Sequence, residues 1–125
     1  MTASDNVLSI RPAAVAGRFY PAEPQRLRKD VSAMLAKTPA APAKPPKALI
    51  APHAGYVYSG KVAARAFRAL EGAPTRRVIL IGPAHYVAFP GIAVPGADAF
   101  ATPLGNVPVD RQSLAGFRLA VRNQK

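Results

Sequence analysis

ALIAPHAGYVYSG (residues 48–60) and VILIGPAHY (residues 78–86) share one pattern, in which a short apolar run is followed by a proline and then a histidine. The first run ends at Ala51 and leads to His53, and the second ends at Ile81 and leads to His85. These are the only two histidines of the chain. Short apolar runs bounded by proline or glycine are typical of buried strands. The pattern therefore predicts a strand before each histidine.

The segment between the two runs, residues 59–70, has the periodicity of a helix. Its apolar residues recur at helical spacing behind Ser59, which we interpret as the N-cap. A strand, a helix and a strand in this order form a right-handed crossover between parallel strands. Both strands then end at one edge of the sheet, where open α/β folds bind ligands. We therefore expect an α/β fold with a strand-helix-strand parallel core and both imidazoles at that edge.

His53 and His85 are candidate metal ligands, because neutral imidazole is a common ligand of zinc, copper and iron. A catalytic metal usually takes three protein ligands, so a further side chain or another chain has to complete the site. Asp98 and Asp110 are the only acids after His85, and the sequence places neither of them near the histidines. A structural or surface role for the histidines is the alternative. No catalytic residue is assigned, and Ser59 makes only a weak case for a hydrolase.

Three tyrosines accompany the histidines and have two interpretations. Tyr56, Tyr58 and Tyr86 either line the mouth of a site or pack as amphipathic aromatic side chains in a loop. The glycines nearby match neither a Walker A motif nor a dinucleotide fingerprint, which argues against nucleotide binding through those motifs.

The composition is that of a single domain outside the membrane. The chain has 125 residues, of which 50% are hydrophobic, and its apolar runs are far too short to span a bilayer. The N-terminus lacks the basic and apolar regions of a secretory signal, so we expect a cytoplasmic protein. The absence of cysteine excludes disulfides and thiolate ligands from this chain.

The chain is strongly basic, with 17 lysines and arginines against 6 acidic residues and a formal charge of +11. These cations are scattered singly or in short groups, and no aromatic residues alternate with them as in single-strand binders. The pattern favours nonspecific attraction to phosphates over specific recognition of nucleic acid.

Further elements are predicted on both sides of the central unit. The proline- and glycine-rich stretch 11–24 indicates an ordered entry loop, and Pro24 suits the first turn of an amphipathic helix. Residues 38–46, TPAAPAKPP, form a Pro/Ala-rich loop. Short strands are expected at Gly91–Pro95 and Asn106–Val109, and a final helix capped by Asp110 follows.

Four segments together resemble the Memo-like family, also known as protein B of the AmmeMemoRadiSam system. They are AGRFYP (16–21), ALIAPHAGYVYSG (48–60), TRRVILIGPAHYVAFPGIAVP (75–95) and TPLGNVPVD (102–110), and they occur in the family's order. The resemblance implies a fold similar to the LigB type of class III extradiol dioxygenases, and it makes His53 and His85 two metal-site residues. It also implies copper or iron as the metal and redox chemistry. Radical SAM and AMMECR1-like proteins are the implied partners, while the animal relatives are linked to motility signalling and phosphopeptide recognition.

The chain departs from the family pattern after its last matching motif. The family domain continues with more strands, helices and site residues, including a cysteine ligand in the animal relatives, whereas residues 111–125 show no matching motif. We therefore expect residues 1–125 to be the N-terminal, truncated portion of a single Memo-like α/β domain. Surfaces left uncovered invite oligomerisation. Dioxygenase-like or redox activity is expected only of a completed site; the alternatives are a non-enzymatic module that binds a peptide or protein, and a nonfunctional remnant.

Overall fold

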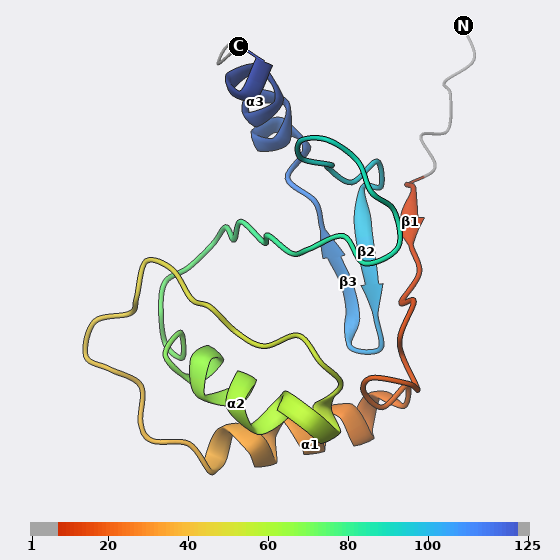
Figure 1. Cartoon of the computed structure of the whole chain (residues 1–125). Helices are drawn as coiled ribbons and strands as arrows, with labels where there is room; N and C mark the ends of the chain where they lie inside the picture. Colours follow the sequence, from red (N-terminus) through yellow and green to blue (C-terminus); the bar gives the residue numbers. More distant parts are fainter. Residues whose placement is uncertain (1–7, 123–125) are drawn as a thin grey trace, which may run out of the picture. The chain divides into compact units, whose positions relative to one another are not determined.

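The chain is an α/β protein, and the computed structural model describes its residues 8–122 (Figure 1). It divides into two compact units. One consists of residues 15–83, and the other combines the N-terminal residues up to 14 with those from 84 onward. Among the described residues, no helix is both long enough and apolar enough to cross a membrane.

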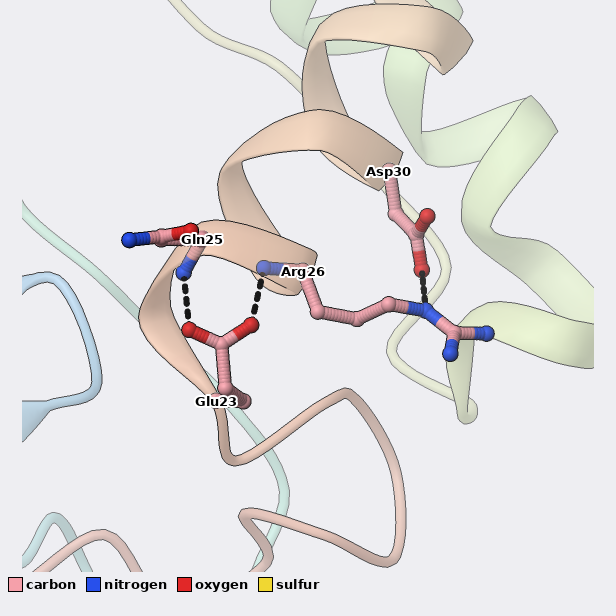
Figure 2. A network of polar contacts seen from close by, with 4 residues as sticks. All are labelled: Glu23, Gln25, Arg26 and Asp30. Carbon is pink, nitrogen blue, oxygen red and sulfur yellow. Dashed lines mark hydrogen bonds and ion pairs between the residues drawn. The ribbon is translucent and has the colours of Figure 1, made fainter.

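Helix α1 (Pro24–Ala36) begins at the predicted proline and is capped by an acidic side chain. The two carboxylate oxygens of Glu23 accept hydrogen bonds from the backbone N–H groups of Gln25 (2.8 Å) and Arg26 (2.6 Å) (Figure 2). The Arg26 side chain also reaches Asp30, one turn further on, at 3.5 Å. The cap satisfies two of the N–H groups that every helix leaves without a partner in its first turn.

Helix α2 (Tyr56–Arg68) confirms the predicted helix but begins three residues before Ser59. The N-cap is Gly55, so the assignment of Ser59 as the N-cap was wrong. The Ser59 hydroxyl lies inside the first turn and donates to the carbonyl of Ala54 at 3.1 Å. After the helix, Gly72 adopts a φ of 72°, in the left-handed region that glycine tolerates best, and the chain turns away.

The two helices lie side by side and form the core of their unit (Figure 1). Leu27 of α1 and Ala64 of α2 are buried, with 4% and 6% of their surface exposed. Gly60 is buried in α2, and a Cβ atom at this position would lie 2.7 Å from the sulfur of Met34. Small residues on α2 thus allow α1 to approach closely.

The two strands predicted beside α2 are not formed. Residues 48–51 and 78–81 have no strand structure, and their side chains include some of the most exposed apolar groups, with Ile50 99% and Leu80 90% exposed. The prediction was wrong here because an apolar run becomes a strand only when another strand pairs with it. No described strand pairs with either run. Gly91–Pro95 is likewise not a strand.

The other unit contains a three-stranded sheet in the order β1 (Ile10–Arg11), β2 (Ala99–Thr102) and β3 (Gly105–Pro108). β1 and β2 are parallel, whereas β2 and β3 form an antiparallel hairpin. β3 confirms the strand expected at Asn106–Val109, shifted by one residue. The parallel pairing of β1 joins residues about ninety positions apart, which explains why local pattern did not predict it.

Helix α3 (Arg111–Arg122) begins directly after Asp110, which caps it as predicted. The Asp110 carboxylate accepts hydrogen bonds from the backbone N–H and the hydroxyl of Ser113, both at 2.9 Å. The last three residues of the expected terminal segment, 123–125, lie outside the described part of the chain.

Candidate metal centre

His53 lies in the loop that leads into α2, and the backbone beside it is held by the entry loop. The N–H of Tyr56 donates to the carbonyl of Phe19 at 2.7 Å. Gly55 lies so close to the same carbonyl that a Cβ atom at this position would be 3.4 Å from its oxygen. The start of α2 is therefore fixed by residues far earlier in the chain, while the His53 side chain itself is exposed.

The Tyr20 and Tyr56 rings strengthen this connection. Their centroids lie 5.8 Å apart with the planes tilted by 43°, a favourable arrangement for aromatic pairs. Burial raises the pKa of the Tyr56 hydroxyl, and the neighbouring Tyr20 adds to the effect. The interpretation of Tyr56 as a packing residue is therefore confirmed. Tyr58, two residues further along the first turn of α2, is instead 87% exposed.

His85 belongs to the other unit and lies in a stretch without helix or strand. Its ring meets the edge of the Tyr86 ring, with centroids 6.4 Å apart and planes at 66°. Both side chains are exposed. The Gly82 and Pro83 pair before His85 interrupts the apolar run, as expected, but it does so in an extended loop and not at a strand end.

The two carboxylates considered as further ligands both have structural contacts. Asp98 accepts a hydrogen bond from the Ser9 N–H at 3.0 Å and lies 3.7 Å from the Arg111 guanidinium. It thereby joins β1 and the start of α3 to the hairpin. Asp110 is the cap of α3.

The described residues do not assemble a complete metal site. His53 and His85 occur in different units, and within residues 8–122 no group of three or more histidine, aspartate or glutamate side chains is close enough to hold a metal ion. The metal-ligand role of the two histidines stays a prediction.

Sequence reasoning missed the contact that fixes the loop carrying His53. The sequence predicted an ordered entry loop over residues 11–24, but the partner of Phe19 and Tyr20 at the start of α2 was not identified. The available signal was Gly55 directly before Tyr56, because a glycine there allows the close approach of another backbone segment.

Comparison with known proteins yields one family. The family described as "Memo-like protein" matches residues 11–120, which includes both histidines and the first ten residues after the last motif. A "MEMO1 family protein" of Aquifex aeolicus is 39% identical over 103 residues, covering 82% of this chain. "Protein MEMO1" of Xenopus laevis is 37% identical over 102 residues, and that of Homo sapiens is 34% identical over 107 residues, covering 82% and 86% of this chain.

The chain is much shorter than these relatives. The matched region covers 38% of the Aquifex protein, 34% of the Xenopus protein and 36% of the human protein. The chain thus spans little more than a third of the length of the relatives it matches.

Proposed function

The chain belongs to the Memo-like family, and on that premise we propose that it is part of a copper- or iron-binding protein with a LigB-like fold and redox, dioxygenase-like chemistry. His53 and His85 supply two imidazole ligands in this proposal. The observation that carries it is the family match itself, which spans both of the chain's histidines in one continuous region.

Imidazole is a suitable ligand type for the proposed metal, but two imidazoles do not complete a metal site. Two imidazoles suit copper or iron, and a metal bound there would supply redox chemistry. A catalytic centre usually needs a third protein ligand, and within residues 8–122 no third metal-binding side chain joins them in a group. In the proposal the remaining ligands come from residues outside this chain.

Metal titration of the chain tests the assignment. The wild-type chain and the variants His53→Ala, His85→Ala and the double variant are titrated with Fe(II) or Cu(I) without oxygen, and bound metal is measured after gel filtration. We expect the wild type to bind metal weakly and each single variant to lose at least about tenfold in affinity, because each removes one of two donors.

Asp98→Asn is the matched control, because its carboxylate contacts Ser9 and Arg111 and is not assigned to metal binding. It should bind metal like the wild type. Uptake that is unchanged in the double histidine variant would remove the proposal.

Radical SAM and AMMECR1-like proteins, in the cytoplasm, are the proposed partners. This part of the proposal depends on the family grouping alone. Co-purification of either protein with the tagged chain from its own source would support it.

A further inference from the structure

A row of cations runs along one face of α2. Lys61, Arg65 and Arg68 follow one another at spacings of four and three residues, which places them on neighbouring turns of the same helical face. All three line shallow hollows that α2 forms with the C-terminal end of α1 and the loop after it, within one compact unit.

Two adjacent hollows share Arg65. The larger has a volume of about 270 Å³ and the smaller about 170 Å³. The larger is lined by Pro39, Ala40, Pro42, Arg65, Arg68 and Ala69. The smaller is lined by Ala33, Met34, Lys37, Thr38, Lys61 and Arg65. Both volumes are below the roughly 300–1,000 Å³ typical of sites for drug-sized ligands, so they suit small ions better than large organic molecules.

The cations of these hollows lack balancing negative charge. Like charges three or four residues apart on a helix destabilise it. In the described part of the chain, only Arg68 of this row forms an ion pair, with the exposed Glu71 at 2.8 Å. The unit of residues 15–83 has twelve basic and only three acidic residues. An anion bound here would relieve repulsion that the protein itself leaves uncompensated.

Arg68 adds a donor without an acceptor. Its Nη1 donates to Glu71, whereas its Nε is buried and has no hydrogen-bond partner. A buried polar group without a partner is costly, and more so on a charged side chain. The guanidinium fork matches two oxygens of a phosphate, and a phosphate in the hollow that Arg68 lines offers an acceptor for Nε.

From these observations we propose that the α1–α2 face binds a small ligand with two linked phosphate groups, of the pyrophosphate type. One phosphate occupies the larger hollow beside Arg68, and the other occupies the smaller hollow between Lys37 and Lys61. Arg65 contacts both, because it lines both hollows. The site is separate from the proposed metal ligands and does not depend on them.

Isothermal titration of the 125-residue chain with inorganic pyrophosphate, in chelator and at low salt, tests the proposal. We expect one pyrophosphate per chain, and weaker binding of orthophosphate because it fills only one hollow. Arg65→Gln should weaken pyrophosphate binding about tenfold or more, as expected for a lost charge-assisted hydrogen bond. Arg65→Lys should bind pyrophosphate with an intermediate affinity, since lysine keeps the positive charge but lacks the forked guanidinium group.

Arg28→Gln is the matched control, because it removes the same charge from an exposed position of α1 that lines neither hollow. It should bind almost like the wild type. Equal weakening by Arg28→Gln and Arg65→Gln would show diffuse charge attraction and overturn the proposal, as would equal affinity for orthophosphate and pyrophosphate. Circular dichroism verifies that each variant keeps its helix content. If Arg65→Gln loses helix content, Lys61→Gln takes its place, because Lys61 is exposed. Lys61→Gln should then weaken pyrophosphate binding more than Arg28→Gln does.

Discussion

At the residue scale, Tyr56 connects the entry loop to the helix that follows His53. Its N–H bonds the Phe19 carbonyl, its ring packs on Tyr20, and burial raises the pKa of its hydroxyl. A raised pKa means that the folded state favours the neutral phenol. The ionisation of one side chain therefore reports on whether the loop and the helix stay together.

This coupling predicts a loss of stability in alkali. Below about pH 10, the usual pKa of tyrosine, the phenol is neutral in both folded and unfolded chains and the stabilisation is complete. As the pH rises from there through the higher pKa of the folded state, the unfolded chain ionises first and the free energy of unfolding decreases. Urea denaturation at several pH values between 8 and 11.5 measures this alkaline slope, the decrease of the free energy of unfolding with pH.

The Tyr56→Phe variant should lose part of this alkaline slope, because it has no proton to release. Tyr58→Phe removes an identical hydroxyl from an exposed position and should keep the wild-type slope. Identical slopes in the wild type and in Tyr56→Phe would show that the Tyr56 ionisation is not coupled to folding.

At the scale of elements, α1 depends on a side-chain cap that its sequence did not predict. Pro24 indicated where the helix begins, but glutamate is not among the usual N-cap residues. Glu23 nevertheless accepts from two backbone N–H groups, and its negative charge lies at the positive end of the helix (Figure 2). Because α1 supplies one half of the helix pair, its start influences the whole unit.

Replacing Glu23 by alanine should therefore lower the free energy of unfolding by about 0.5–2 kcal/mol, the range found for lost N-caps. The comparison variant is Glu71→Ala, which removes an equal charge from an exposed side chain that pairs with Arg68 and should cost less than about 1 kcal/mol. Both are measured by urea denaturation at pH 7. A smaller effect for Glu23→Ala than for Glu71→Ala would contradict the capping role.

At the scale of the whole molecule, the described chain leaves its most apolar run uncovered. Residues 78–81, VILI, are all exposed and lie outside any helix or strand. A short segment that is apolar, rich in β-branched residues and free of charge and proline is prone to pair with another copy of itself. The uncovered run thus gives a physical basis for the expected oligomerisation.

We predict that the chain associates as its concentration rises and that Ile79→Lys reduces this association by placing a charge in the run. Sedimentation velocity over a range of protein concentrations measures the association of the wild type and of the variant. Val57→Lys is the control, since Val57 is at least as exposed as Ile79 but belongs to α2. Association that is weakened equally by both substitutions would show an effect of net charge alone.

The elements that depend on local signals could be predicted from the amino-acid sequence alone. Helical periodicity and Pro24 predicted α1, the spacing between Ala63 and Leu70 predicted α2, and Asp110 predicted the start of α3. Family membership was also readable from the motifs, since they keep their order over most of the chain. Helices and caps use neighbours within a few residues, so local sequence is sufficient for them.

Long-range packing selects which apolar runs become strands and which distant residues come into contact. Strand formation needs a partner strand, so the run before His85 stays extended while Ile10–Arg11 pairs with Ala99–Phe100. The candidate metal site could be predicted only as two histidines in a repeated pattern, because the geometry that would unite them was inferred from strands that do not form. Lys37 likewise lines a hollow together with Lys61 and Arg65 of α2 only because of how α1 packs, which no local pattern encodes.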